Sequence, residues 1–207
     1  MHHLKQFFYF IILGLVACNV SVNKDIIIED GKVHQGNLTT VNGNILIGEN
    51  CKVDGICRTV NGLIEVGQHS TVDELQTVNG SIRLNSNVII EKNVQTVNGS
   101  VNCDSGVVIR HDIKTINGSI KLKDAEVENS IRTTNGDIFL NHSLVKGDII
   151  IKRKREEMEG SKIKIYVGNG STVEGNILAD ENAGVEVIIS KDSEVKGKIH
   201  NAITLTE

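Results

Sequence analysis

Short runs in which apolar and polar residues alternate recur along most of this chain. An alternation of period two is typical of a β-strand that buries one face, and no run keeps a helical period for more than a turn or two. Valine and isoleucine dominate the apolar positions, as they do on pleated surfaces. The pattern therefore predicts an all-β protein. The clearest alternating pairs are Ile45/Ile47, Ile64/Val66, Ile82/Leu84, Val101/Cys103, Ile120/Leu122 and Ile138/Leu140.

The tetrapeptide Thr-x-Asn-Gly is repeated six times, and the alternating runs recur with it. Its copies start 19, 18, 19, 19 and 18 residues apart. A repeat of this length is too long for the strand of a hairpin but suits one coil of a stack, made of three short strands and tight corners. We therefore predict a single-stranded parallel β-helix, or β-solenoid, which we expect to be right-handed. The copies begin at Thr40, Thr59, Thr77, Thr96, Thr115 and Thr133.

The Asn-Gly pair of the repeat is expected to form one corner of each coil. Glycine reaches left-handed backbone angles without a Cβ clash, and asparagine is among the few other residues that tolerate them. Equivalent residues of successive parallel coils lie roughly 4.8 Å apart, so each asparagine amide should donate to the next. The threonines should form a parallel column. The predicted structural ladder comprises Asn42, Asn61, Asn79, Asn98, Asn117 and Asn135.

Weaker copies extend the pattern on both sides of the motif. Residues 26–38 resemble an opening coil, and the segments Ile165–Ile177 and Val187–Ile199 match each other at a shift of 22 residues. We predict about nine coils of roughly 18–22 residues, which form a rod roughly 40 Å long at the spacing of β-strands. The repeats should occupy 25–150, a charged exposed loop 151–162, and further coils 163–207.

The N-terminal residues have the features of a secretory leader. Lys5 precedes an apolar run that is too short to span a bilayer. The run ends in Leu-Val-Ala-Cys, which resembles the lipobox of bacterial lipoproteins. By that resemblance, residues 1–17 are a signal peptide, Cys18 is acylated and anchored in membrane lipid, and residues 18–24 form a tether. An ordinary secretory leader with an incidental cysteine is the alternative.

The same resemblance implies a location. Asn19 follows the cysteine, at the position where an aspartate favours retention in the inner membrane of Gram-negative bacteria. We therefore expect a lipid-anchored protein of the bacterial cell envelope. In a Gram-negative source it should lie on the periplasmic face of the outer membrane.

Composition and charge agree with a thin aliphatic core and disfavour a nucleic-acid partner. Of the 207 residues, 3% are aromatic, and the sequence has neither tryptophan nor proline. A narrow tube filled with Val, Ile and Leu needs no large rings. The formal charge is −4, and the one basic cluster, 152–155, is followed at once by glutamates. Nucleic-acid binding would require a basic stripe, so we expect no such partner.

The remaining cysteines and the histidines are the candidates for chemistry. Cys51 and Cys57 could pair in an oxidising compartment if their Cα atoms come within roughly 7 Å. Cys103 falls in an inward column and should be a buried apolar residue. No spacing typical of a zinc site occurs, so we expect neither a metal nor a cofactor. The histidines at polar, corner-like positions are His34, His69, His111, His142 and His200.

Enzymes occur among β-solenoids, but this sequence lacks their signatures. A hexapeptide-type acyltransferase needs a histidine beside an extended loop, and none lies near 151–162. Polysaccharide lyases carry long loops with clustered charges, and no nucleotide-binding or nucleophile-elbow motif is present. We expect no catalytic residues. A flat threonine array could bind ice or a crystal lattice, although satisfying the corner explains the threonines more simply.

The repeats resemble two bacterial families. The region Thr40–Ile150, with TVNGSI, TINGSI and TTNGDI, resembles the β-solenoid repeats of adhesin-type domains of the head-GIN group. The stretch Ile165–Ile199 is similar to bactofilins, which polymerise end to end. Both resemblances imply a stacked parallel solenoid more firmly than a role. Unlike bactofilins, this sequence has the predicted leader and the segment that resembles a lipobox, which disfavours a cytosolic cytoskeletal role.

Together these features predict a non-enzymatic, membrane-anchored envelope lipoprotein that acts as a structural or interaction solenoid. Two alternatives remain open. The protein could be a self-assembling, bactofilin-like polymer that forms a homo-oligomer through its terminal coils. It could also be an adhesin that binds glycans at the cell surface. The sequence names no ligand.

Overall fold

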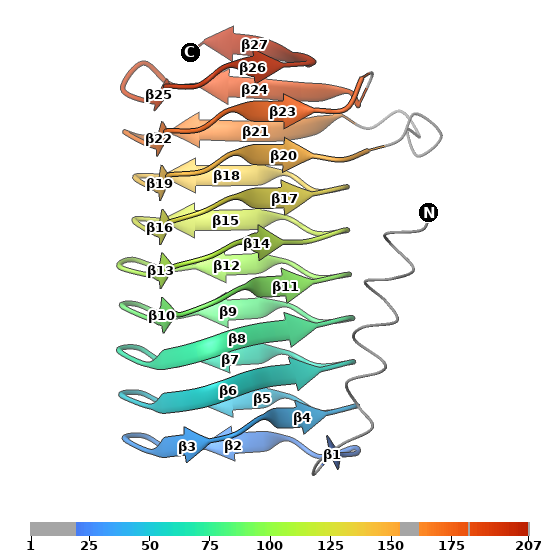
Figure 1. Ribbon diagram of the computed structural model, residues 1–207, viewed down its shortest axis with the longest axis vertical. Helices are drawn as coiled ribbons and strands as arrows, with labels where there is room; N and C mark the ends of the chain where they lie inside the picture. The colour runs from blue at the N-terminus through green and yellow to red at the C-terminus, as the bar shows by residue number, and fades with distance from the viewer. Residues whose placement is uncertain (1–19, 154–161, 182, 207) are drawn as a thin grey trace.

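The computed structural model describes residues 20–153, 162–181 and 183–206, and every regular element among them is a β-strand. The strands pair in parallel, and the chain winds into about nine stacked turns. Figure 1 shows successive turns rising along one axis in the order of the sequence. The predicted parallel β-solenoid is therefore confirmed, whereas its right-handedness stays a prediction.

Each coil has three sides, which we name faces A, B and C in the order in which the polypeptide visits them. Face A carries the strand that ends in the motif threonine. Its strands are β1 (Val20–Ser21), β4 (Leu38–Thr40), the second halves of β6 (Lys52–Thr59) and β8 (Thr71–Thr77), β11 (Val94–Thr96), β14 (Ile113–Lys114), β17 (Ile131–Thr133), β20 (Ile149–Ile151), β23 (Ile177–Ala179) and β26 (Ile199–His200).

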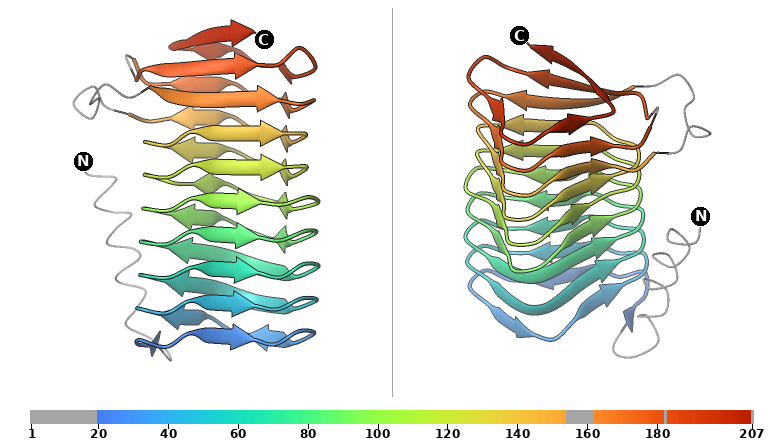
Figure 2. Two further views of the ribbon diagram at one scale, coloured as in Figure 1. Left: turned by 180° about the vertical axis from the view of Figure 1, so that it is seen from behind. Right: turned by 45° about the horizontal axis from the view of Figure 1, so that its top comes forward.

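Face B follows the motif and is a separate sheet of ten strands. They are β2 (Ile26–Ile28), β5 (Ile45–Ile47), β7 (Ile64–Val66), β9 (Ile82–Leu84), β12 (Val101–Cys103), β15 (Ile120–Lys123), β18 (Ile138–Asn141), β21 (Ile163–Gly168), β24 (Val185–Ile189) and β27 (Ala202–Thr206). The view from above in Figure 2 shows the coils enclosing one interior.

Face C closes the coil and joins face A through the continuous strands β6 and β8. It comprises their first halves and the short strands β3 (Val33–Gln35), β10 (Ile89–Ile90), β13 (Val108–Ile109), β16 (Glu126–Val127), β19 (Leu144–Val145), β22 (Thr172–Val173) and β25 (Glu194–Val195). No helix in the described part of the protein is long and apolar enough to cross a membrane.

The core consists of columns in which an aliphatic side chain lies on its counterpart from the coil before. The predicted match between the two last segments is confirmed, because Ile165 pairs with Val187 and Ile177 with Ile199. Each fully buried Val, Ile or Leu contributes about 1.5–3 kcal/mol to stability. The central column of face B, fully buried throughout, runs through Ile45, Ile64, Ile82, Val101, Ile120, Ile138 and Ile165.

The corner between faces A and B, the motif corner, differs from the sequence-based prediction. None of its six asparagines has a positive φ, and among its glycines only Gly118 and Gly136 do, at 155° and 158°. A Cβ at Gly80 would instead overlap the carbonyl oxygen of Gly62 in the coil before, and the other motif glycines are similarly crowded. The prediction of a left-handed Asn-Gly turn is wrong. Glycine is needed there because successive backbones touch.

The left-handed residues lie at the corner between faces B and C, which we call the left-handed corner. From Gly31 to Gly170 each coil has a residue there with a φ in the left-handed region, and successive coils place it in register; Asn169, beside Gly170, is left-handed as well. Asparagine, aspartate and histidine tolerate this region better than most residues. The non-glycine members, with φ between 46° and 60°, are Asn50, His69, Asn87, Asp124, His142 and Asn169.

Two segments that we expected outside the stack contribute to it. Val20 and Ser21, in the expected tether 18–24, pair with Thr39 and Thr40. Ile151, the first residue of the expected loop 151–162, ends β20, and two residues later Arg153 is 3% exposed. The first coil thus begins within the tether, and 151–153 belong to the coil that they leave.

Candidate functional site

The motif asparagines form a hydrogen-bonded ladder along the edge between faces A and B. Each side-chain amide donates to the Oδ1 of the asparagine one coil earlier, at 2.7 Å from Asn61 to Asn42 and 3.2 Å from Asn135 to Asn117. The ladder starts one rung earlier than the motif, because Asn42 donates to Asn23. The buried Oδ1 of Asn135 has no hydrogen-bond partner among the described residues, so the ladder ends there.

Asn23 was not predicted from the sequence, because no threonine or glycine stands beside it. Its spacing of 19 residues from Asn42 matches the repeat and could have revealed it. The direction of the bonds was also not evident from the sequence. Each amide donates toward the N-terminal end of the rod, and the remaining rungs measure 2.8–2.9 Å at Asn79, Asn98 and Asn117.

The motif threonines point into the solenoid. Thr59 is fully buried, and its hydroxyl donates to the carbonyl oxygen of Gly43 at 2.8 Å. Equivalent bonds tie Thr40 to Lys24 and Thr96 to Gly80. The threonine column therefore fixes the corner from inside and presents no flat array for an ice or crystal lattice.

The cysteines of the described region are buried and free. Cys51 and Cys57 do not pair: the Cys51 thiol donates to the Glu29 carbonyl at 3.1 Å, and Cys57 lies inside face A. Burial, helped by the charge of Asp73, raises the pKa of Cys57 to about 12. Burial raises the pKa of Cys103 as well. The thiols of Cys57 and Cys103 stay protonated at neutral pH and behave as small apolar side chains, as was expected of Cys103.

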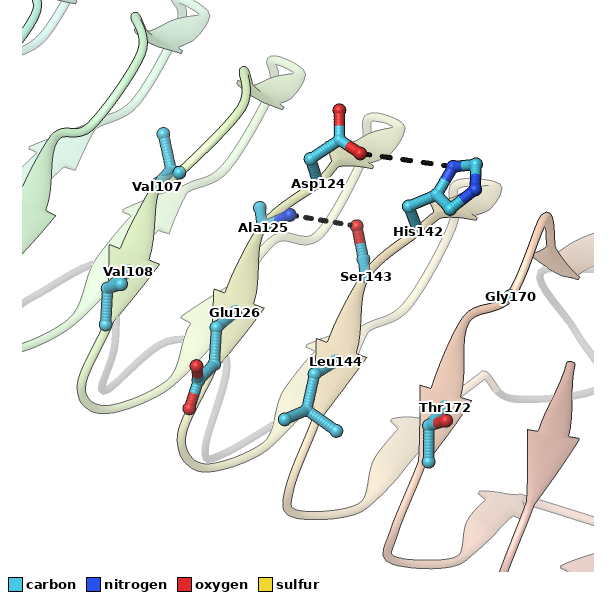
Figure 3. A pocket seen from close by; sticks show the side chains of 11 residues that line it. Val107, Val108, Asp124, Ala125, Glu126, His142, Ser143, Leu144, Gly170 and Thr172 are labelled. Carbon is cyan, nitrogen blue, oxygen red and sulfur yellow. Dashed lines mark hydrogen bonds and ion pairs between the residues drawn. The ribbon is translucent and has the colours of Figure 1, made fainter.

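A shallow hollow lies on face C beside the left-handed corner (Figure 3). Val108, Glu126, Leu144 and Thr172 line it along the strands, and Asp124 and His142 stand at its rim. The imidazole of His142 lies 3.9 Å from Asp124, and both side chains are exposed. The hollow thus offers an acidic and apolar surface of low curvature, with its one histidine at the edge.

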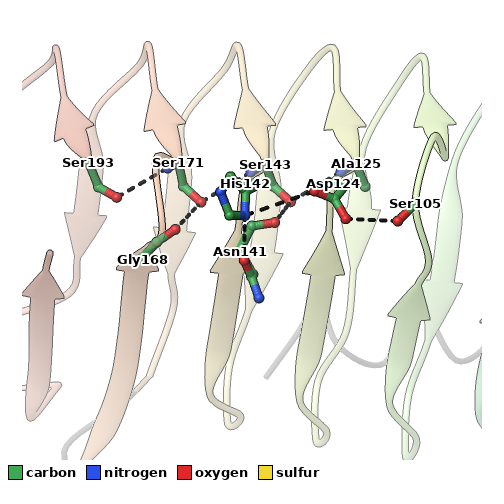
Figure 4. A network of polar contacts seen from close by, with 9 residues as sticks. All are labelled: Ser105, Asp124, Ala125, Asn141, His142, Ser143, Gly168, Ser171 and Ser193. Carbon is green, nitrogen blue, oxygen red and sulfur yellow. Dashed lines mark hydrogen bonds and ion pairs between the residues drawn. The ribbon is translucent and has the colours of Figure 1, made fainter.

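Serines beside the left-handed corner serve its backbone (Figure 4). The hydroxyl of Ser143 accepts from the N–H of Ala125 at 3.2 Å, and that of Ser171 accepts from the N–H of Ser143 at 3.1 Å. Ser193 repeats the arrangement one coil later. Because these hydroxyls satisfy buried N–H groups, we assign them to the corner and not to nucleophilic chemistry.

Charged side chains form a ladder along the corner between faces C and A, which we call the third corner. From Glu91 onward the sign alternates with each coil, and Arg110 contacts both Glu91 and Glu128, at 2.9 and 3.9 Å. Exposed pairs of this kind contribute little each to stability. The ladder continues through Lys146, Glu174 and Lys196.

Asp112 is a buried carboxylate at the same corner. Its side chain is 9% exposed and contacts Lys114 at 2.9 Å and Arg132, and it accepts from the N–H of Ser130 at 3.1 Å. Burial alone would raise the pKa of Asp112. The hydrogen bonds from Lys114 and Ser130 and the two positive charges outweigh it and lower the pKa below its ordinary value.

Two aromatic rings interrupt the polar exterior of face B. Phe139 and Tyr166 stack at 5.0 Å between centroids and 8° between planes, and the Lys121 ammonium lies 5.7 Å from the Phe139 centroid. In register, Ile188 and Leu205 continue the stripe. Because the rings cover one another, they stabilise adjacent coils and offer a sugar their edges more than their faces.

Cys18, the predicted lipidation site, lies outside the described residues. Among the residues that the structure describes, no group of three or more His, Cys, Asp or Glu side chains could hold a metal ion. The predicted histidines are not brought together: His69 and His142 share the left-handed corner but stand in different coils, and His200 lies on face A.

Comparison of the sequence and structure with protein-family models, with curated proteins and with solved structures found no match.

Proposed function

We propose that the protein is a non-enzymatic lipoprotein of the bacterial cell envelope, in which a rigid solenoid serves as a structural or interaction surface. The observation that carries the proposal is the position of β1. Val20 and Ser21 join the first coil only two residues after the predicted lipidation site, Cys18. An anchor at that cysteine would hold the rod by its first coil and leave the following coils free to project from the membrane.

The exterior supports a role without catalysis. The repeated polar residues are used by the stack: the motif asparagines bond to one another, the motif threonines other than Thr133 to backbone carbonyls, and the corner serines to backbone N–H groups. What remains outside is a set of charge ladders and the aromatic stripe, which suit contact with another macromolecule or spacing within the envelope.

Mass spectrometry of the mature N-terminus tests the anchor. We expect the mature protein to begin at Cys18, to carry the mass of acyl groups, and to fractionate with membranes. The matched variant Cys18→Ser should lose both the added mass and the membrane association. A mature protein that starts elsewhere, or an unmodified Cys18, would contradict the proposal.

A second candidate function, end-to-end self-assembly, is favoured by the two ends of the described stack. The last strand, β27, exposes Ile203 and Leu205, at 57% and 45%, and the first coil exposes Ile27 and Val33, at 64% and 66%. Uncovered strand edges with apolar side chains are templates for pairing. Two such different ends would make head-to-tail contacts, which extend into filaments instead of closing.

Sedimentation at rising protein concentration tests this second function. Assembly predicts species that grow with concentration and that disappear in the variant Leu205→Lys, whereas Lys164→Glu on the side of the rod should leave them unchanged. A strictly monomeric protein at every concentration would refute assembly and leave the anchored-surface proposal standing.

A further inference from the structure

Seven Asn-Gly dipeptides make this protein unusually rich in sites for deamidation. Six belong to the motif, and the seventh is Asn169–Gly170. In this reaction the glycine backbone nitrogen loses its proton and attacks the amide carbon of the asparagine side chain. The new bond between that nitrogen and that carbon closes a five-membered imide, the bond from the carbon to the amide nitrogen breaks, and ammonia leaves. Water then opens the imide to aspartate or isoaspartate. Glycine favours the attack because it has no side chain to hinder it.

The ladder opposes this reaction at the motif asparagines. Asn79 donates to Asn61 at 2.8 Å and accepts from Asn98 at 2.8 Å, so both polar atoms of its amide are engaged. An attack would require the amide to turn toward the following nitrogen and to break both bonds. The backbone cannot help, because Gly80 is pressed against Gly62 of the coil before.

Asn169 lacks both the ladder bonds and the crowding of the following glycine. It is exposed at the left-handed corner with a φ of 52°, and its side-chain amide makes no hydrogen bond to any described residue. A Cβ at Gly170 would meet only the imidazole of His142, at 3.6 Å, so no backbone of a neighbouring coil crowds this glycine, and its N–H donates to the Asp192 carboxylate. We propose that Asn169 is the main deamidation site of the folded protein, and that the ladder slows the reaction at the other six sites until the coils separate.

The ability of the protein to refold should depend on the protection of its ladder asparagines from deamidation. Deamidation of separated coils would replace ladder amides by carboxylates, which only accept hydrogen bonds. Neighbouring carboxylates about 4.8 Å apart would repel one another and could not rebuild the ladder. Protein that stays unfolded would therefore lose its ability to fold. Asn135, the last rung, has an unbonded Oδ1 and a longer bond of 3.2 Å, and should react at an intermediate rate.

Peptide mapping by mass spectrometry tests the proposal on the full-length protein in mild detergent at neutral pH, aged with and without urea. In urea all seven sites should react at similar rates. In the folded protein Asn169 should keep its rate, while Asn61, Asn79 and Asn98 slow by about thirtyfold, the factor that two hydrogen bonds of about 1 kcal/mol each would produce. Equal rates at the ladder in both states, or a slower Asn169, would overturn the proposal.

A ladder variant adds a local test. Asn79→Ala removes the acceptor of Asn98 and the donor to Asn61, so deamidation should accelerate at both while Asn117 keeps its rate. Asn102→Ala, on the outside of face B, is the matched control and should change none of these rates. In folded Asn79→Ala, confirmed by circular dichroism, unchanged rates at Asn61 and Asn98 would contradict protection by the ladder.

Discussion

The motif corner and the left-handed corner solve the same problem, a sharp change of direction in every coil, by different physical means. At the motif corner the backbones of successive coils touch, and only glycine fits. At the left-handed corner the backbone needs one residue with a positive φ, which asparagine, aspartate, histidine or glycine supplies. The comparison shows that one residue type repeats strictly where successive coils are in close contact, as at the motif glycines. A position that only needs a positive φ accepts several residue types.

Alanine substitutions of two glycines should separate the two corners most strongly. Gly80→Ala places a Cβ on the carbonyl oxygen of Gly62, and because backbone cannot move aside cheaply, we expect a loss of about 3 kcal/mol in the free energy of unfolding. Gly170→Ala, at φ 73° and with only an ordinary contact to the His142 imidazole, should lose only about 1 kcal/mol. Denaturant titration measures the loss of stability in each variant. Equal losses would contradict the proposed difference between the two corners.

Removing one ladder amide should have the next largest effect. Asn98→Ala deletes the bonds to Asn79 and from Asn117 and leaves two neighbouring groups to water. Because the ladder is exposed, we expect a loss of about 1–2 kcal/mol. Thermal and denaturant unfolding should agree on the value. Asn102→Ala serves as the control, and a loss no larger than that of the control would show that the ladder adds nothing to stability.

A glycine at the left-handed corner should stabilise slightly. His69 holds a φ of 59°, which costs a non-glycine residue strain that glycine does not have. The greater freedom of glycine in the unfolded state offsets part of the gain, so His69→Gly should raise stability by up to about 1 kcal/mol. The same glycine at Asn61 should be destabilising, because it removes a ladder rung. If His69→Gly destabilised the protein, the contacts of the His69 side chain would contribute more to stability than the relief of backbone strain.

The third corner gives the smallest expected effect and a dependence on pH. The pKa of Asp112 is lower in the folded protein, so its contribution to stability is present above its unfolded pKa of about 3.9 and is lost as the pH falls through the folded value. The free energy of unfolding, measured at pH 7 and again below pH 4, should show this loss. The variant Asp112→Asn should have a flatter acid dependence, and an unchanged one would assign the loss to other carboxylates.

The sequence by itself determined the architecture. The alternation of apolar residues and the recurrence of Thr-x-Asn-Gly required parallel coils with like residues aligned, and the file of asparagines followed from that spacing. The register of the last coils, Ile165 on Val187 and Ile177 on Ile199, was also contained in the sequence. Each of these features depends on periodicity, which the order of residues records fully.

Only the tertiary structure decided what the glycines and the cysteines do. Crowding of Gly80 by Gly62, or the burial of Cys57 away from Cys51, depends on the distances between coils and on the direction of side chains, which no spacing in the sequence specifies. The same holds for the role of β1 in the first coil and for the reach of the ladder back to Asn23. Repetition fixes which residues meet, and packing decides how closely and with which atoms.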